Sequence, residues 1–343
     1  MSAPVAFAVD TFGDLTRDAS GKELHHAQVI RNVVAEAVLA ESVGIDAFGI
    51  GEHHRRDFAV TAPEIVLAAI AARTERILLA TAVTVLSSDD PVRVFERFAT
   101  LDAISNGRAE IILGRGSFTE SFPLFGYDLD QYEELFEEKI DLLHHLLDER
   151  PVTWEGKLRP ALTNQDVFPK TESGRLRTWV GVGGSPQSVV RAVHYRMPLM
   201  LAIIGGAPQR FLPFVDLYHR ALKEFDAGVL PVGVHSPGYV AQTDEQARED
   251  VWPHYRDMIN RIGRERGWGP TNRAHFEAEI EDGSLYVGSP ETVATKIANT
   301  IRTLGVQRFE LKYSSGTLAH EKLMSSIALY GEKVVPRVRE LLA

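Results

Sequence analysis

Short apolar runs alternate with helical patterns along almost the whole chain. Several of the runs are apolar throughout, which is typical of parallel strands that are covered on both faces. Eight runs predict strands, at 5–10, 47–51, 77–85, 109–114, 178–183, 199–204, 233–241 and 308–313. Spacings typical of amphipathic helices predict helices at 24–43, 63–73, 91–105, 132–148, 186–196, 208–226, 244–266, 290–304 and 319–342.

Three of the predicted helices carry a start signal. Asp90-Pro91, Ser185-Pro186 and Ser289-Pro290 each place an oxygen-bearing side chain before a proline. The oxygen can accept a hydrogen bond from a free N–H of the first turn, and a proline at the first helical position loses no helical hydrogen bond. These helices are therefore expected to begin at 91, 186 and 290.

Eight alternating strand and helix units favour a closed (β/α)8 barrel, an α/β fold of about 250 residues before insertions. The chain has 343 residues, and we interpret residues 1–343 as a single barrel domain. The surplus length falls at about 150–177 and about 264–288, two insertions expected outside the barrel. An open doubly wound sheet is the alternative, but the residues after the first strand contain no G-x-G-x-x-G fingerprint.

The helix predicted at 63–73 has no polar face over two turns, because it reads Ile-Val-Leu-Ala-Ala-Ile-Ala-Ala from residue 65. An outer helix of this kind needs a cover on its far side. A second copy of the chain is the favoured cover, since two-fold homodimers are the commonest oligomers. Burial under an insertion is the alternative.

Composition narrows the possible partners. The formal net charge is −10, and no Lys/Arg run is long enough to follow a phosphate backbone, so nucleic acid is not expected as a partner. No apolar run approaches the roughly 18 residues needed to span a bilayer, and no signal peptide precedes the first strand, which predicts a cytoplasmic protein without a membrane partner. The chain has no cysteine, so thiolate nucleophiles and disulfides are excluded.

The ends of two predicted strands offer a phosphate site. Gly183-Gly184-Ser185-Pro186 places two residues without side chains and a hydroxyl at a helix N-terminus, where N–H groups suit an anion. Gly114-Arg115-Gly116-Ser117 ends the preceding barrel strand and adds a guanidinium. An ordinary tight turn explains the first motif alone, but the two motifs together favour a bound phosphate.

Glu52-His53-His54 follows the second strand and provides a carboxylate and two imidazoles for proton transfer. A metal site is not expected, because adjacent histidines on an extended chain point in opposite directions and no third ligand is evident. At least one of the two histidines is expected to be a buried group with a structural partner. The chain contains no G-x-S-x-G motif of a hydrolase, and the residues alone leave the reaction open.

Taken in order, these segments resemble the luciferase-like flavin-dependent monooxygenases, the bacterial luciferase superfamily. The similarity covers most of the chain and depends on the collinear set rather than on any single motif. The segments that carry it are Phe48–His54, Thr81–Leu86, Asp90–Arg93, Leu101-Asp102, Ser105–Arg108, Gly114–Gly116, Gly183–Ser185 and Gly288–Glu291.

The resemblance implies a barrel that binds FMN, or a deazaflavin in some branches, with the ring at the C-terminal mouth. Gly114, Arg115 and the Gly183-Gly184-Ser185 turn would then lie at the phosphate. The bond between Ala82 and Val83 matches a non-prolyl cis peptide beneath the flavin ring, and His53 matches the active-site histidine of the family.

The implied reaction uses a separate NAD(P)H-dependent flavin reductase as the source of reduced flavin and transfers one oxygen atom of O2 to an unidentified small organic substrate. Gly114 replaces a reactive cysteine of the light-emitting subunit, and Gly183 and Gly184 replace a Glu-Ser pair, so light emission is not expected. Two alternatives remain: a deazaflavin-dependent dehydrogenase or reductase, and a non-catalytic flavin-binding protein. No metal is expected in any of these readings.

Overall fold

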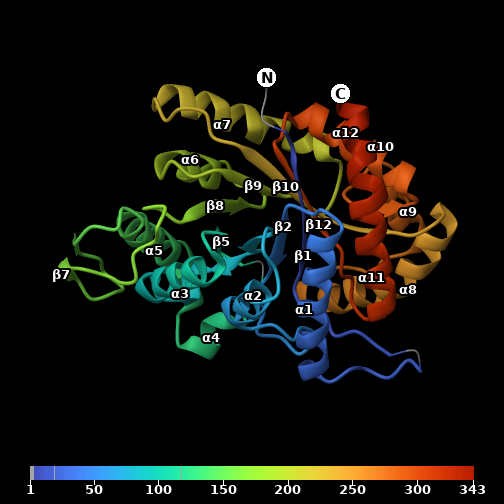
Figure 1. Cartoon of the computed structure of the whole chain (residues 1–343), viewed down its shortest axis with the longest axis horizontal. Coiled ribbons are helices and arrows are strands. Elements are labelled where there is room, and N and C mark those ends of the chain that lie inside the picture. The colour runs from blue at the N-terminus through green and yellow to red at the C-terminus, as the bar shows by residue number, and fades with distance from the viewer. Residues whose placement is uncertain (1–3, 19, 117) are drawn as a thin grey trace.

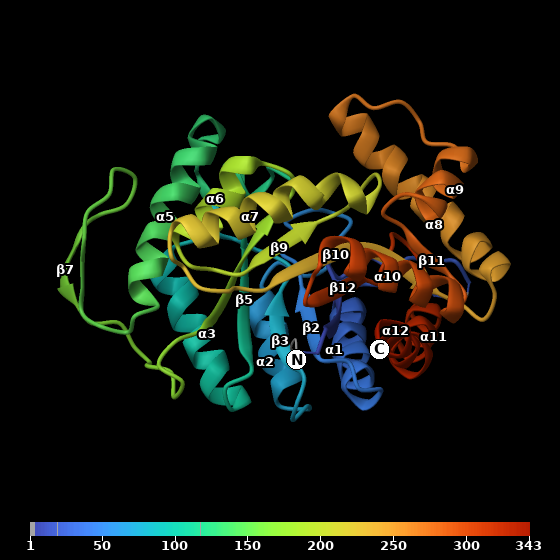
Figure 2. The ribbon, with the colours of Figure 1, turned by 90° about the horizontal axis from the view of Figure 1, so that it is seen from above.

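A computed structural model describes residues 4–18, 20–116 and 118–343. Within them, eight parallel strands close into a barrel with helices on the outside (Figures 1 and 2). Each barrel strand pairs with the next in chain order, and the last strand pairs with the first. The barrel strands are β1 (Ala6–Thr11), β2 (Ala47–Ile50), β3 (Leu78–Thr81), β5 (Ala109–Gly114), β8 (Arg177–Val182), β9 (Leu199–Ala202), β10 (Val232–Val240) and β12 (Arg308–Lys312).

All eight predicted strands are present, and so are the helices predicted between them. The helices are α1 (His26–Ser42), α2 (Pro63–Ala71), α3 (Pro91–Ser105), α4 (Ser121–Phe125), α5 (Tyr132–Leu146), α6 (Pro186–His194), α7 (Leu212–Glu224), α8 (Asp244–Arg266), α9 (Arg273–Glu281), α10 (Pro290–Leu304), α11 (His320–Leu329) and α12 (Val335–Leu342). The predicted (β/α)8 barrel is therefore confirmed.

The three predicted start signals act as helix caps. Asp90, Ser185 and Ser289 are the N-caps of α3, α6 and α10, and each side chain accepts a hydrogen bond from a backbone N–H of the first turn. Two other predicted helices are interrupted. A 3-10 turn at Pro208–Phe211 precedes α7, and a π-helical turn at Tyr330–Val334 separates α11 from α12.

Several short elements were not predicted from the sequence. An antiparallel hairpin of β6 (Val152–Trp154) and β7 (Leu162–Gln165) projects beyond α5, on the side of the molecule opposite α8 and α9 (Figure 2). In the second predicted insertion, α9 is followed by β11 (Tyr286–Gly288), which extends the sheet by pairing with β10. The two-residue strand β4 (Thr84–Val85) continues the path of β3 along β5.

The apolar faces of the strands point outward to the helices, and much of the barrel interior is charged. On β12, Phe309 and Leu311 belong to the core beneath the helices. Arg308 and Glu310 alternate with them and are buried inside the barrel, where the Arg308 guanidinium pairs with both Glu310 and Glu110 of β5. The side chains of Arg308, Glu110 and Glu310 are all buried, so this ion-pair cluster is a fixed part of the barrel floor.

No helix within residues 4–18, 20–116 and 118–343 is both long enough and apolar enough to cross a bilayer.

Candidate active site

Ala82 and Val83, together with the glycines against which Val83 packs, form a shelf at the C-terminal mouth of the barrel. The peptide bond between Ala82 and Val83 is cis, as the resemblance implies. The Val83 side chain lies against Gly114 of β5, where an added Cβ would be 2.3 Å from Val83 Cγ2. It also lies near Gly181 of β8, whose added Cβ would be 3.2 Å from Val83 Cγ1. The glycine at 114 is therefore required by the packing of Val83.

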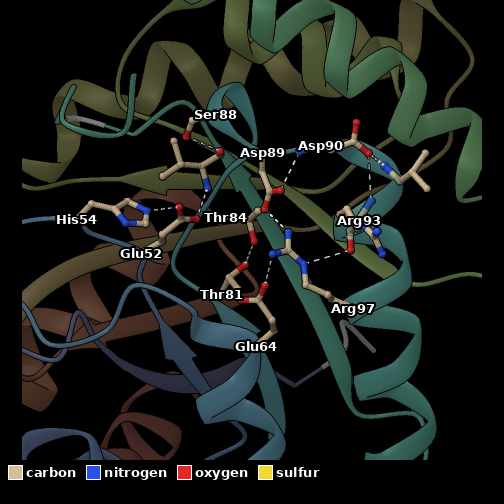
Figure 3. Close-up of polar contacts among 12 residues, drawn as sticks. Glu52, His54, Glu64, Thr81, Thr84, Ser88, Asp89, Asp90, Arg93 and Arg97 are labelled. Carbon is tan, nitrogen blue, oxygen red and sulfur yellow. Dashed lines mark hydrogen bonds and ion pairs between the residues drawn. The ribbon is translucent and has the colours of Figure 1, made fainter. Parts of the chain in front are cut away.

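Glu52 ties the loop after β2 to the segment after this shelf (Figure 3). One carboxylate oxygen of Glu52 accepts a hydrogen bond from the backbone N–H of Val85 at 3.2 Å, and the other lies 2.8 Å from His54 Nε2. The Thr84 hydroxyl donates to the Thr81 hydroxyl at 3.0 Å, which joins the two ends of the same segment. His54 is thus the histidine with a structural partner, one of the two roles expected for the pair.

His53 lies in an aromatic enclosure at the mouth. Its ring centroid is 4.6 Å from that of Phe12, 4.7 Å from that of Phe58 and 5.1 Å from that of Phe118. The residue is 8% exposed. Such an imidazole is largely shielded from bulk water.

Glu120 is the acidic neighbour of His53, and the sequence analysis did not identify it. Its carboxylate lies 3.7 Å from His53 Nδ1. Burial alone would raise the pKa of Glu120, but His53 and Arg55 hold that pKa below its ordinary value. Glu120 is therefore an anion that can orient the His53 ring.

A second imidazole lies below Phe12. His235 of β10 stacks on the Phe12 ring with centroids 6.4 Å apart, and its Nδ1 is 2.9 Å from Asp10 Oδ2. Burial would lower the pKa of His235, but Asp10 and Glu310 raise it above its ordinary value. These groups give the floor of the site a buried charged layer that the sequence analysis also missed.

The predicted phosphate motifs meet across β5 and β8. Ser185 caps α6, and Ser188 of the same helix lies with its hydroxyl 3.4 Å from Arg115 Nη2. Gly183 and Gly184 are exposed, and an added Cβ at Gly183 would meet no atom within 4 Å. Ser117, the last residue of the first motif, lies outside the described residues.

Arg115 has a carboxylate partner at this edge. Its guanidinium pairs with Glu133 of α5, whose side chain is 61% exposed, and it lies over the Tyr132 ring at 5.2 Å. Tyr132 in turn donates a hydrogen bond from its hydroxyl to the Gly116 carbonyl at 2.9 Å. An exposed ion pair contributes little to stability, so a ligand phosphate can replace Glu133 at small cost.

The model of the luciferase-like monooxygenase family matches residues 11–308. A protein of Sinorhizobium fredii, y4vJ, is 33% identical, with 92% of this chain and 93% of that protein covered. N-acetyl-S-alkylcysteine monooxygenase of Bacillus subtilis is 24% identical, with 82% and 86% covered. The chain therefore belongs to the luciferase-like monooxygenase family, and the predicted family and enzyme class are confirmed.

Solved structures share the fold over nearly the full length. Monooxygenase RslO1 of Streptomyces bottropensis has a TM-score of 0.83 at 23% identity, with 96% of this chain and 99% of that one covered. The oxygenating constituent of 3,6-diketocamphane monooxygenase of Pseudomonas putida, solved with FMN, has a TM-score of 0.76 at 19% identity, with 98% and 99% covered. The coenzyme F420-dependent tetrahydromethanopterin reductase of Methanopyrus kandleri has a TM-score of 0.73 at 20% identity, with 98% and 100% covered. One similar structure thus contains FMN and another is that of an F420-dependent enzyme, which matches both predicted cofactor types, FMN and a deazaflavin.

Proposed function

We propose that the chain is an FMN-dependent monooxygenase that uses reduced FMN and O2 to place one oxygen atom in a small organic substrate. One observation carries the proposal. In a barrel of this family, an arginine and an open glycine-serine turn at a helix N-terminus stand at the β5 and β8 edge, across the mouth from a shielded histidine. A separate NAD(P)H-dependent reductase supplies the reduced flavin.

The residues at this edge fit the cofactor. Arg115, Ser185 and the N–H groups of the Gly183-Gly184 turn hold the phosphate, since the space above Gly183 is open and backbone can approach an anion there. Ala82, Val83 and Gly114 would contact the flavin from the shelf that they form at the mouth. When bound, the reduced flavin supplies the electrons that activate O2, which no side chain of this chain can supply.

His53 is the residue that we assign to proton transfer at the mouth. The side chains of Phe12, Phe58 and Phe118 pack around the His53 imidazole and exclude water from three of its sides. An imidazole can act as acid or base near neutral pH, and Glu120 beside Nδ1 favours one ring orientation. The proton then moves at Nε2, on the side of the ring away from Glu120.

Hydride transfer with a deazaflavin is the second candidate function. It is favoured by the match of the whole barrel to an F420-dependent reductase, whose chain is covered to 100%. Both functions place a phosphate at Arg115, so this edge does not separate them.

A titration of the purified protein with FMN and with coenzyme F420, followed by oxygen consumption of the reduced complex, tests the proposal. The monooxygenase proposal expects FMN to bind and the reduced complex to consume O2. Binding of F420 alone would support hydride transfer, and FMN binding without redox turnover would indicate a non-catalytic flavin protein. If neither cofactor binds, the assigned phosphate site is wrong.

We also propose that the chain, as one barrel domain, forms a homodimer in the cytoplasm through α2 and α3. Ile65 of α2 is 69% exposed and Ile104 of α3 is 52% exposed, and Ala69 and Ala72 add to the exposed apolar area beside Ile65. Apolar faces of this kind are typical of subunit contacts. Analytical ultracentrifugation tests this interface. The wild type should sediment as a dimer and Ile65→Lys as a monomer.

A further inference from the structure

A cavity of about 460 Å³ opens beside the mouth, away from the phosphate edge. It is lined by residues that follow β1, β2 and β12 and by the end of α8, and three of these residues are Arg55, Arg56 and Arg261. Pockets that bind small organic ligands have volumes of about 300–1,000 Å³. The lining carries three guanidinium groups and also three carboxylates, those of Glu23, Asp57 and Glu265, so an anionic ligand binds here by replacing one of these carboxylates.

The planar fork of Arg55 already holds a carboxylate. Its Nη1 and Nη2 donate hydrogen bonds to the two oxygens of Glu265 at 2.8 and 2.7 Å. The Arg55 side chain is 14% exposed and the Glu265 side chain is 47% exposed. Because about half of the Glu265 side chain is open to solvent, a ligand carboxylate of the same shape can take its place at the Arg55 fork.

The remaining charges do not saturate the arginines. Asp57 lies 3.0 Å from Arg261 and 3.4 Å from Arg55 Nε, so it serves both. Arg56 is exposed and forms no ion pair with a described residue. When Glu265 turns to solvent, Nη1 and Nη2 of Arg55 and the exposed Arg56 become the donors for a new anion.

The cavity is also coupled to the reacting end of the site. The Arg55 guanidinium lies 4.3 Å from the centroid of the Phe118 ring, and the His53 ring lies 5.1 Å from the same centroid. In the barrel order, β1, β2 and β12 lie opposite β5 and β8. Phe118 therefore contacts both Arg55, which lines the cavity, and His53, and the cavity lies on the opposite side of the barrel from the phosphate edge.

We propose that this cavity binds the anionic end of the substrate, a carboxylate or a sulfonate, and that Glu265 occupies the Arg55 fork in its absence. The role of this anion as the substrate rests on the proposed function, whereas the binding of an anion at Arg55 does not depend on it. The substrate class is a small organic anion that is held by its charged end.

Calorimetric titration of the flavin-free full chain with hexanoate, hexanesulfonate and hexanol tests the proposal. We expect both anions to bind more tightly than hexanol, and the tighter anion identifies the preferred group. Arg55→Met should weaken anion binding by about tenfold or more, because a two-pronged charged hydrogen bond is lost. Glu265→Gln should strengthen it by up to about fivefold, because the carboxylate that competes for the Arg55 fork is removed.

Arg337→Met is the matched control, since Arg337 forms a similar two-pronged pair with the exposed Glu291 away from the mouth. It should bind both anions as the wild type does. Equal binding of hexanol, or an unchanged anion affinity in a folded Arg55→Met variant, would overturn the proposal, as would the absence of anion binding in both wild type and Glu265→Gln. FMN titration of the same preparation separates the two ideas, because a failure to bind FMN refutes the proposed function and leaves the anion result standing.

Discussion

The two edges of the barrel mouth hold their arginines in the same way but surround them differently. Arg115 and Arg55 each pair with an exposed glutamate, Glu133 and Glu265 respectively. At the Arg115 edge the neighbours are exposed glycines and the N-terminus of α6. At the Arg55 edge the neighbours are side chains around a cavity that opens beside the mouth. Backbone N–H groups suit a phosphate, whereas a cavity with arginines suits the end of an organic molecule.

His53 lies between the two edges. Its replacement should change neither FMN binding at the Arg115 edge nor anion binding at the Arg55 edge. His53→Gln is expected to lower turnover by about 10²–10⁴-fold, the usual contribution of a general acid or base. FMN affinity should remain that of the wild type. Turnover is measured with a substrate identified by product analysis, and a variant with the wild-type rate would remove His53 from the mechanism.

The glycines of the Arg115 edge should separate packing from ligand binding. Gly114→Ala should lower the free energy of unfolding by about 1–3 kcal/mol, because the new Cβ overlaps Val83. Gly183→Leu should leave the free energy of unfolding nearly unchanged but weaken FMN binding, since its side chain projects into open space. Urea unfolding and FMN titration of both variants make this test, and loss of stability at 183 would contradict it.

The barrel floor, which contains Glu310, lies below both edges. Titration of Glu310 should not change ligand binding at either edge. Burial raises the pKa of Glu310 from 4.5 to about 7, an effect that Arg308 opposes and Asp10 supports. The folded protein then holds this proton more tightly than the unfolded chain, so the stabilisation is complete below pH 4.5 and is lost as the pH rises through 7.

The free energy of unfolding of the wild type should fall between pH 5 and pH 8. In Glu310→Gln this fall should be smaller than in the wild type by about 1 kcal/mol or more. Urea unfolding at both pH values measures it. Glu340→Gln, on the exposed face of α12, should keep the wild-type fall. Identical falls in Glu310→Gln and wild type would show that the Glu310 carboxyl is not protonated in the folded state.

The strands and the main helices could be predicted because apolar periodicity and proline-preceded caps are local signals. The charged floor could not, since β12 reads Arg-Phe-Glu-Leu-Lys and a two-residue period does not tell which face meets the helices. The structure places the apolar face outward and the charged face inside.

The positions of His53, Arg115 and Ser185 were predictable because the ends of parallel strands and the starts of helices meet at one edge. Their partners were not. Glu120 reaches His53 from a later loop, and Glu265 reaches Arg55 across 210 residues of sequence. Contacts of this kind depend on the closed barrel and have no spacing along the chain.

Calorimetric titration of FMN into wild type, Arg115→Met and Arg55→Met tests most directly whether the two edges have separate roles. We expect FMN binding to weaken by about 10–100-fold in Arg115→Met, because hydrogen bonds to a charged phosphate are lost. It should stay within about twofold of wild type in Arg55→Met, because the Arg55 guanidinium pairs with Asp57 and Glu265 and with no residue of the phosphate edge within the described part of the chain. Full affinity in Arg115→Met together with lost affinity in Arg55→Met would contradict the assignment of the phosphate to the β5 and β8 edge.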